Sequence, residues 1–493
     1  MAKKLFGGSS KGRFSGAKGT PAREPEQTEV EELDLDLTEE TPEEVIPETP
    51  SPRRTETKSR KSKSDKKAKK AKKRGGPLKV VAVLLAILLV IELAYCLVIF
   101  TDLIPPIAKL RTIYIETAMS TMRHQWLAKA LIPGDIVQAV VDSVNQAQAD
   151  QVGVNSGWAD VTEPSVETKS PSSGFSKEAA ASMLSLLAQD IGLTSGEDDF
   201  FELFHELDEE TTLAYVQSHP ECISAGWENF YVNEAGLDDE GTTILTNQGD
   251  QVLAIDAANG LMVIRITGST YRGVLVIGKD PSRLMCAPSS QWGRIGERAG
   301  EIAEANNGLV AITGSGFGDG AGYAEGADQA GGAMFSGVAK GTHYPWGYKR
   351  VELHLDNRLY ITDADDGYSA NCTDATEWTP ALIVDGKIVV TAGDGYTALN
   401  PRACIGQTRD ESIMFLGIEG RKIDSAGCDA NECAEILARY GAYQAMNVDG
   451  GTSAIVWYEG EYIMRCSNDA LPEGRRLPNA WVYCADTVPD PEV

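Results

Sequence analysis

Positive charge is scarce over most of this 493-residue chain. Residues 1–76 hold 19 of the 45 Lys+Arg and 14 of the 72 Asp+Glu, which leaves 26 basic and 58 acidic residues beyond them. Such an acidic body repels nucleic-acid phosphates at long range, and it disfavours anionic polymers unless local Arg or Lys residues or a bridging cation meet them. We therefore expect no nucleic-acid partner.

Two common ligand signatures are also absent. The cysteines show no paired Cys-x-x-Cys spacing, so a zinc site built from sulfur is not expected. The glycine-rich stretch 313–320 lacks the Lys-Ser/Thr ending of a Walker loop, and no helix follows it as a dinucleotide fingerprint requires. We expect no cofactor. A divalent cation that bridges acidic side chains to phosphate stays open, although no ligand spacing requires one.

Apolar periodicity is almost missing from residues 1–76. The stretch 24–48 is acidic and interrupted by proline, and 53–74 carries 13 basic residues. Neither block buries enough apolar surface to offset the loss of chain entropy. We predict a disordered tail that is first acidic and then polybasic.

The next segment is the long apolar run 80–100, which carries one charge, Glu92. At about 1.5 Å per residue it spans about 31 Å, the thickness of a bilayer's hydrocarbon core. We predict a single transmembrane helix at 77–101 in the cell membrane, and its long leader is unlike that of a cleaved signal peptide. Lys and Arg precede it, which places the N-terminus in the cytoplasm and 101–493 outside.

Two features of this region have alternative interpretations. The basic run before the helix is either a solvated tail or a contact to anionic membrane lipid. Glu92 in mid-span marks either a function or partner, or a tolerated neutral acid.

An even number of cysteines follows the span. Cys96 lies within the apolar run, and an even set in an oxidising compartment suggests disulfides, although the sequence selects no connectivity. The exported cysteines are Cys222, Cys286, Cys372, Cys404, Cys428, Cys433, Cys466 and Cys484.

Segments of helical and polar character precede the main domain. We predict a juxtamembrane helical segment at 107–146, whose helix 107–131 packs on the domain or a partner because its apolar residues recur at three- and four-residue spacing. These are Ile115, Met119, Met122 and Trp126, and His124 among them is expected to be an ordinary surface or core histidine.

Residues 147–174 turn polar without periodicity and are predicted to be a linker. A helical segment is predicted at 175–224, with Ser176 as N-cap of a helix that ends before Gly192.

From 225 to 486 the sequence consists of short β-rich runs separated by Gly, Asp and Asn. Helical patterns at 296–306 and 429–440 each precede a strand, which predicts an α+β domain with a mixed β-sheet and packed helices. The predicted strands are 252–255, 261–267, 273–277, 309–313, 351–355, 382–384, 388–391, 413–418, 445–448, 454–458 and 480–483.

The most concentrated polar signal is the stretch 447–453, NVDGGTS, between two apolar strands. A carboxylate followed by two glycines lets backbone N–H groups turn toward a bound anion, and the hydroxyls of Thr452 and Ser453 add donors. The same pattern is also typical of a hairpin turn. Arg402 and Arg421 are ambiguous too, because each suits either bidentate phosphate binding or a structural ion pair.

Taken in order, these stretches resemble the phosphodiester glycosidase family over about 306–484. The matching stretches are 313–317, 382–387, 400–402, 405–408, 420–421, 427–441 and 447–453, followed by Arg475, Arg476 and Asn479. The anchor followed by 115–119 is similar to bacterial members that present this domain at the cell surface. The family usually has Asn where Thr313 stands and a third Gly where Thr452 stands.

The resemblance implies hydrolysis of a sugar 1-phosphodiester in cell-surface or exopolysaccharide metabolism, with a phosphorylated glycan as partner. Asp449 would act on water or on the sugar, while Arg402 and the Gly450 and Gly451 backbone hold the phosphate. The other implied substrate-binding residues are Asn447, Ser453, Thr452, Gln407, Gly314, Ser315 and Arg421.

Asp319 and Asp394 are either a second carboxylate or turn residues, so retention or inversion at the sugar stays open. A non-catalytic module that binds phosphorylated glycans or assembles exopolysaccharide would use the same cradle, and a structural envelope protein would use its glycines for turns only. The enzyme and binding hypotheses both require that the segments around 315, 402 and 449 fold into one anion-holding cleft.

Overall fold

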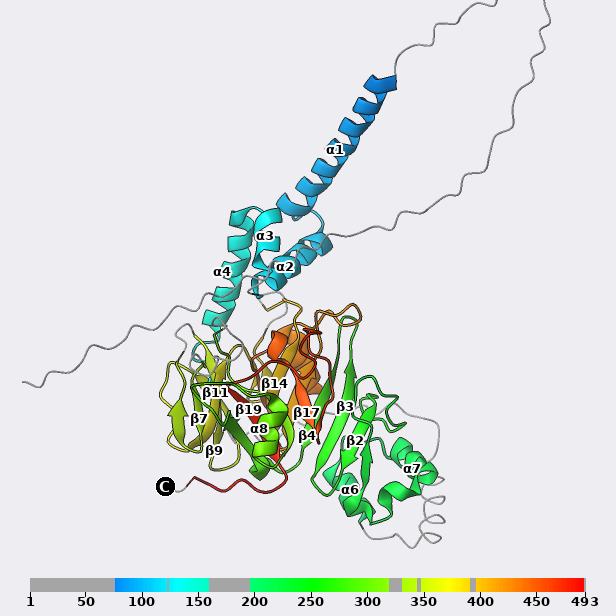
Figure 1. Cartoon of the computed structure of the whole chain (residues 1–493), viewed down its shortest axis with the longest axis vertical. Helices are drawn as coiled ribbons and strands as arrows, with labels where there is room; N and C mark the ends of the chain where they lie inside the picture. Colours follow the sequence, from blue (N-terminus) through cyan, green and yellow to red (C-terminus); the bar gives the residue numbers. More distant parts are fainter. Residues whose placement is uncertain are drawn as a thin grey trace, which may run out of the picture. The chain divides into compact units, whose positions relative to one another are not determined.

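The computed structural model describes residues 76–121, 124–158, 196–318, 330–343, 347–390 and 396–491 (Figure 1). The chain divides into the units Met1–Gly75 and Gly76–Val493, and the second contains everything described. Several predictions lie outside the described residues: the disordered tail up to Gly75, the helix that starts at Ser176, Met122, and the candidates Asp319 and Asp394.

The first described element is α1, Gly76–Phe100. Its segment Lys79–Phe100 has a mean hydropathy of 2.9, and by length and composition it is able to cross a membrane. Such a helix near the N-terminus is compatible with a single-pass anchor or with a signal sequence. Its apolar side chains, such as Leu85 and Val90, are exposed in the protein alone.

Three short helices follow α1: α2 (Pro105–Met119), α3 (Gln125–Leu131) and α4 (Gly134–Asp150). The prediction of one helix over 107–131 is wrong, because the chain breaks between α2 and α3. Ser120 Oγ and Thr121 Oγ1 donate hydrogen bonds back to the carbonyls of Thr117 and Ala118, which competes with continuation of the helix.

The end of α1 and the three short helices share a small apolar core. It consists of Ile99, Ile115, Ala118, Ala128, Ile132 and Val137. Helix α4 continues through Asp150, into the segment predicted to be a linker, and residues 151–158 then lie on the main domain. Gln151 Nε2 donates to the carbonyl of Ala381 at 2.9 Å, and the indole of Trp158 donates to the carbonyl of Leu359 at 2.8 Å.

The main domain contains three β-sheets. The largest has the order β1-β2-β3-β4-β15-β14-β16-β12-β13, and the two five-stranded sheets have the orders β10-β9-β11-β7-β8 and β18-β17-β6-β19-β5. The strands of the first sheet are β1 Tyr231–Asn233, β2 Val252–Asp256, β3 Leu261–Thr267, β4 Arg272–Gly278, β12 Ala381–Val384, β13 Lys387–Ile388, β14 Arg402–Thr408, β15 Ile413–Ile418 and β16 Ala442–Asn447. The strands of the second are β7 Ala333–Phe335, β8 Val338–Lys340, β9 Lys349–His354, β10 Leu359–Asp363 and β11 Cys372–Trp378. Those of the third are β5 Leu284–Pro288, β6 Gly308–Thr313, β17 Val456–Tyr458, β18 Glu461–Tyr462 and β19 Asn479–Cys484.

The α+β prediction is confirmed, but the sheets are not mixed. Every pairing between named strands is antiparallel, as in β3 with β4 and β14 with β15. Neighbouring strands are joined by short connections such as 268–271 and 409–412, and a connection of that length joins antiparallel strands only.

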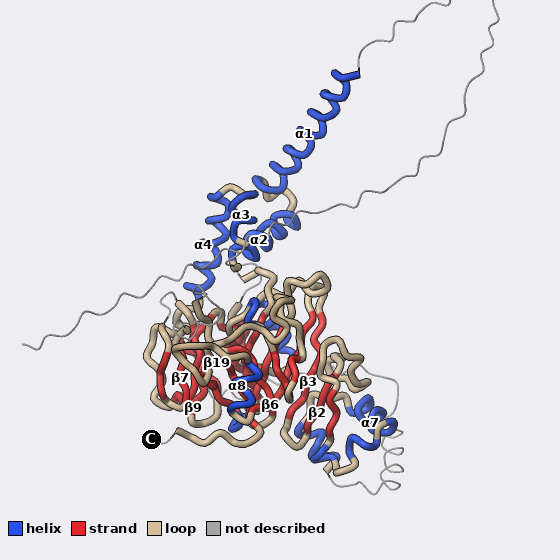
Figure 2. The backbone as a smooth tube through the Cα atoms, in the orientation of Figure 1, coloured by secondary structure: helices blue, strands red, loops and turns tan. Residues whose placement is uncertain are grey.

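Two helices of the main domain pack on different sheets. α8 (Ala299–Ala305) packs on β6 and β19, as Figure 2 shows, and α9 (Ala430–Arg439) packs on β16 and β12. The predicted helix at 429–440 is confirmed, and its start follows from a capping box. Asp429 accepts from the N–H of Glu432 at 2.8 Å, and Glu432 accepts from the N–H of Asp429 at 3.0 Å.

The remaining helices lie between the N-terminal segment and β2. They are α6 (Glu197–Leu203), α7 (Glu209–Ser218) and the 3₁₀ turns Pro220–Ile223 and Trp227–Asn229. With α9 they cover one face of the largest sheet, and the third sheet covers the other. Strand β14 shows the result: Ala403 and Ile405 enter one apolar core, and Cys404 between them enters the second.

All nine cysteines are free in this structure. The suggested disulfides are therefore not formed. The Sγ atoms of Cys428 and Cys433 lie 3.1 Å apart, well beyond the bonded distance of about 2.05 Å. The cysteines beyond Cys96 are buried in the apolar cores and act there as small hydrophobic side chains.

Candidate functional site

The segments around 315, 402 and 449 meet where β6 and β16 end and β14 begins. Cys404 of β14 is opposite Asn447 of β16, so the start of one strand lies beside the end of the other. Backbone hydrogen bonds continue past the strands: the N–H of Val448 donates to Ala403 at 2.8 Å, and the N–H of Asp449 donates to Gly314 at 3.2 Å. The convergence predicted from the sequence is present.

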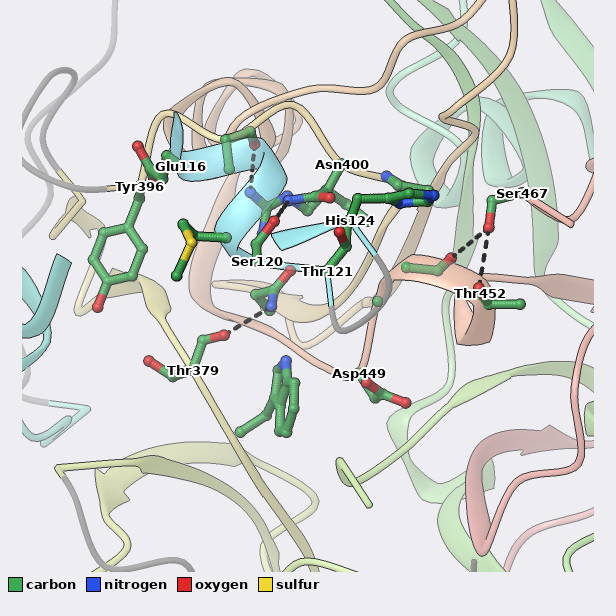
Figure 3. Close-up of a pocket in the computed structure, with 18 of the residues that line it drawn as sticks. Glu116, Ser120, Thr121, His124, Thr379, Tyr396, Asn400, Asp449, Thr452 and Ser467 are labelled. Atoms are coloured by element: carbon green, nitrogen blue, oxygen red, sulfur yellow. Dashed lines mark hydrogen bonds between the residues drawn. The ribbon is translucent and has the colours of Figure 1, made fainter. Parts of the chain in front are cut away.

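A cavity of about 1130 Å³ opens beside this junction. Asp449, Asn447, Arg402 and Arg421 line it, together with the glycines and threonine of the 447–453 loop. Figure 3 shows Asp449 and Thr452 on one side of the cavity. The Asp449 side chain is only half-buried, so it is open to the cavity and not sealed in the core.

Two guanidinium groups contribute positive charge to the cavity. Arg402 donates from Nε to the carbonyl of Cys428 at 3.2 Å and from Nη2 to the carbonyl of Ala398 at 2.8 Å. Arg421 donates from Nη2 to Oδ1 of Asn400 at 3.3 Å. These acceptors are neutral, and among the described residues neither arginine forms an ion pair. The arrangement favours an anion site over a structural ion pair.

The two arginines lie close enough to influence each other. Burial lowers the pKa of Arg421, and the charge of Arg402 lowers it further. A guanidinium still remains charged at neutral pH because its ordinary pKa exceeds about 12. Two neighbouring cations in a partly buried cavity are stabilised by an anion between them, and the geometry of arginine suits a phosphate.

The two glycines of the loop permit a close approach between chains. Gly451 has a φ of +63°, and a Cβ there would lie 3.4 Å from Nη2 of Arg421. A Cβ at Gly450 would lie 2.9 Å from the carbonyl oxygen of Pro401. The N–H of Gly451 donates to that same carbonyl at 3.0 Å. The sequence led us to expect this N–H to bind the phosphate, but in the structure it is used within the protein.

Three predicted residues support the loops and do not line the cavity. The N–H of Ser315 donates to Oδ1 of Asn479 at 2.8 Å, and Nδ2 of Asn479 donates to Oγ of Ser315 at 2.7 Å. Gly314 lies under the same asparagine, where a Cβ would be 1.9 Å from Oδ1. Ser453 is buried, and its hydroxyl has no hydrogen-bond partner among the described residues.

Gln407 also lies away from the cavity. Its Oε1 accepts from the N–H of Leu359 at 2.6 Å, and its Nε2 donates to the carbonyls of Asn357 and Glu411 at 2.8 and 3.0 Å. These bonds join β14 to the β9–β10 turn, so the residue has a structural role here. Asn447 does reach the cavity, and its Nδ2 donates to the carbonyl of Thr379 at 2.8 Å.

The helices before the domain supply the opposite side of the cavity, which the sequence prediction missed. Glu116, Ser120, Thr121 and His124 line it, and Figure 3 labels all four: Glu116 on α2, and the other three after its end. His124 was expected to be an ordinary surface or core residue, and it lies exposed at the surface, where it lines this cavity. The available signal was the four-residue spacing of Glu116 and Ser120, which puts both on one helix face.

Hydrogen bonds fasten α2 to the loop 396–400. Oε2 of Glu116 accepts from Oγ1 of Thr397, and Oγ1 of Thr117 accepts from the N–H of Leu399 at 3.1 Å. Burial raises the pKa of Glu116, and this effect exceeds the opposing effects of the Thr397 hydrogen bond and the Arg402 charge. The Glu116 carboxyl thus gains a proton more readily than an exposed glutamate.

Aromatic side chains complete the cavity. Tyr348, Trp378 and Tyr396 line it, and the rings of Tyr348 and Trp378 are 5.7 Å apart in an edge-on arrangement. Burial raises the pKa of Tyr348, and the nearby Asp449 charge adds to the effect. Within the described ranges, no group of three or more His, Cys, Asp or Glu side chains is placed to hold a metal ion.

Comparisons with known proteins concern mainly the second half of the chain. Residues 302–484 match the family model described as phosphodiester glycosidase. The chain is 28% identical over 109 residues to the SPbeta prophage-derived uncharacterized protein YomE of Bacillus subtilis (strain 168), a match that covers 22% of this chain and 17% of that protein.

Two solved structures align with part of the chain. One is the zebrafish N-acetylglucosamine-1-phosphodiester alpha-N-acetylglucosaminidase catalytic domain auto-inhibited by its pro-peptide, at a TM-score of 0.39 and 16% identity over 45% of this chain and 82% of that chain. The other is a hypothetical protein from Synechocystis, at a TM-score of 0.32 and 15% identity over 48% of this chain and 65% of that chain.

Proposed function

We propose that this chain hydrolyses a sugar 1-phosphodiester between the anomeric carbon and the phosphate oxygen, because residues 302–484 match the phosphodiester glycosidase family model. The observation that carries the proposal is the placement of Asp449, Arg402 and Arg421 around one cavity. A glycosyl phosphate needs a carboxylate to act at the sugar carbon and cations to hold the phosphate. Asp449 supplies the first, and Arg402 and Arg421, which form no ion pair among the described residues, supply the second.

The chemistry follows from the charge that develops as the bond breaks. The oxygen of water bonds to the anomeric carbon, the carbon–oxygen bond to phosphate breaks, and its electron pair leaves with the phosphate monoester. Arg402 and Arg421 stabilise the charge gained by that leaving group. In one route Asp449 accepts the proton of the attacking water. In the other its carboxylate bonds to the sugar carbon as the phosphate leaves, and water then attacks that carbon and breaks the ester, which restores the carboxylate. Asn447 and Thr452 lie beside Asp449 to orient sugar hydroxyls.

The proposed location of the reaction is the outer side of a membrane, in cell-surface or exopolysaccharide metabolism. Two observations support it: the apolar segment Lys79–Phe100, and the basic block 53–74 before it. The basic block favours a cytoplasmic N-terminus, which leaves the domain outside. Contact of that block with anionic lipid belongs to the same proposal.

Replacement of Asp449 by Asn tests the reaction. The parent should release free sugar and a phosphomonoester from a panel of glycosyl phosphodiesters, and D449N should lose at least about 100-fold in kcat while it still binds a sugar 1-phosphate. Asp469 provides a matched control, because it lies at the rim of the same cavity and is paired with Lys422. D469N should keep its turnover.

The alternative is a non-catalytic module that binds phosphorylated glycans or helps assemble exopolysaccharide. A parent protein that binds sugar 1-phosphates but turns over no diester in the panel would establish the module and sink the hydrolase. A parent protein that neither binds sugar 1-phosphates nor hydrolyses any diester of the panel would support a structural envelope protein, in which the glycines only form turns.

A further inference from the structure

Part of the lining of the cavity is apolar, and most of these apolar residues lie outside residues 302–484. It consists of Met119 of α2, Val141 and Val144 of α4, and Trp378 and Pro380 of the main domain, and we call these five residues the apolar wall. They share the cavity with Arg402, Arg421 and Gly450, so one open cavity has a cationic part and an apolar part.

The valines of α4 are not explained by the folding core. Val137, one turn earlier, is buried in the small core of the N-terminal helices. Val141 and Val144 continue the same helix face, but they are half-buried and belong to none of the apolar clusters. Apolar side chains that line a cavity and pack on no core are available to a ligand.

The chemistry of this wall restricts the alcohol on the far side of the phosphate. A second sugar would need several hydrogen-bond partners. The indole N–H of Trp378 is the one donor among these five side chains, and valine, methionine and proline side chains provide none. An alkyl or isoprenoid chain needs only apolar surface, and each buried methylene strengthens its binding. The cavity, at about 1130 Å³, has room for such a chain beside a sugar phosphate.

We propose that the cavity takes a glycosyl phosphodiester whose second ester is to a lipid alcohol, with the chain along the apolar wall and the phosphate at Arg402 and Arg421. This proposal rests on the proposed function, since it names the substrate class of the same site. The helices that carry Met119, Val141 and Val144 follow the candidate membrane span in the sequence. The residues proposed to bind the lipid chain therefore belong to the same part of the protein as the proposed membrane anchor.

Binding of alkyl phosphates tests the wall independently of the sugar. The full chain in lipid nanodiscs is titrated by calorimetry with inorganic phosphate and with methyl, butyl and hexyl phosphate, and the signal of empty nanodiscs is subtracted. Affinity should rise with chain length, by up to about fourfold for each methylene that the wall covers. The double variant V141N/V144N should bind inorganic phosphate as the parent does, but its affinity should no longer increase with the length of the alkyl chain.

Two further variants keep the test decisive. Ala139 is exposed on the same helix, so A139N introduces asparagine into α4 away from the cavity and should preserve the rise. V144T keeps the volume of valine and adds one hydroxyl, so it should reduce the rise even if the double variant fails to fold.

The outcomes separate this proposal from the proposed function. A flat series in a parent that binds inorganic phosphate would overturn the lipid proposal and leave the phosphate site standing. A rise that persists in both V144T and the double variant would also overturn it, because the chain would then bind elsewhere. Failure of the parent to bind any phosphate would remove the phosphate site, and the lipid proposal with it.

Discussion

Nδ2 of Asn400 donates a hydrogen bond of 3.0 Å to Oγ of Ser120, across 280 positions of sequence. The same asparagine accepts from Nη2 of Arg421 through Oδ1 at 3.3 Å. One side chain therefore connects the helix after the apolar span to a cation of the candidate phosphate site. The position of Arg421 depends on a segment that lies outside the family domain.

This connection predicts coupling between Ser120 and Asn400. N400A removes the acceptor of Arg421 and should weaken binding of a sugar 1-phosphate by about 5- to 30-fold, whereas S120A should cost about 2- to 10-fold. Because both changes act on one network, the double variant should lose less than the product of the two. Calorimetric titration of the four proteins measures this, and strictly multiplicative losses would show that the contact does not position Arg421.

Substitution of Gly451 should damage both stability and binding. G451A combines a positive φ with a Cβ placed 3.4 Å from Nη2 of Arg421, so we expect a loss of about 1–2 kcal/mol in the free energy of unfolding. G460A isolates the backbone effect, because Gly460 has a φ of +100° and open space around it. G367A should be neutral, since Gly367 lies in open space without a positive φ. Equal phosphate binding by G451A and G460A would contradict a role for Gly451 at Arg421.

Replacement of Glu116 should change how stability depends on pH. Burial raises the pKa of Glu116 in the folded protein, so the folded state holds the proton more tightly than the unfolded state. The stability that this carboxyl contributes is present below its ordinary pKa of about 4.5 and is lost as pH rises through the raised value. E116Q should lack that loss, and chemical unfolding from pH 4 to 8 should show the two proteins diverging as pH increases.

Glu116 variants also distinguish its positional role. E116Q keeps a hydrogen-bonding side chain opposite Thr397 and should preserve sugar 1-phosphate binding near the parent level. E116A removes the contact to Thr397 and should weaken binding. If alanine and glutamine behave alike, the carboxyl does not hold the 396–400 loop.

A buried ion network in the second sheet predicts the opposite pH dependence. Burial of Glu352 would raise its pKa, but hydrogen bonds from His354 and Ser369 and the charge of Arg350 outweigh burial and hold the pKa at about 2. Its stability contribution is present above about pH 4.5 and is lost as pH falls toward 2. The loss amounts to about 3 kcal/mol at full protonation.

E352Q should therefore be destabilised by about 3 kcal/mol near pH 7, and the difference from the parent should shrink below pH 4. Urea unfolding at several pH values measures both effects. The exposed Glu461 is a suitable control, because E461Q should change the unfolding free energy by less than about 0.5 kcal/mol at every pH. A constant difference between E352Q and the parent would show that the ion network does not depend on this charge.

Much of the β-structure follows from local sequence, and its exceptions have a physical cause. The strands 261–267 and 413–418 were predicted with the bounds they have, because their apolar runs end at turn residues. Strand β14 was not predicted as a strand. Its sequence RACIGQT contains an arginine, a glycine and a glutamine that lie in the middle of the largest sheet, where two of the hydrogen bonds of Gln407 are to Asn357 and Leu359, about 50 residues away.

The candidate site was predicted in part for a related reason. Asp449, Arg402 and Arg421 each lie in a short sequence motif, namely 447–453, 400–402 and 420–421. The order of these motifs along the chain resembles that of the family, and this order identified the three residues. Glu116 and Ser120 have no such pattern, because their role arises from a hydrogen bond to a loop that lies 280 residues away. Ser315 and Gln407 were predicted at the site because the sequence gives residue type and order but not the direction of a side chain within a loop.

Lys349 is completely buried, and its ammonium group has its acceptors in a short stretch of the N-terminal segment and in one aspartate. Nζ donates to the carbonyls of Gln151 and Val154, to Oδ1 of Asn155 at 3.1 Å and to Oδ1 of Asp363 at 2.6 Å. A soluble fragment cut at residue 302 would leave this cation inside the protein with most of its acceptors deleted. Expression of the main domain should therefore start ahead of Gln151, and we expect a fragment without that stretch to misfold whatever its activity.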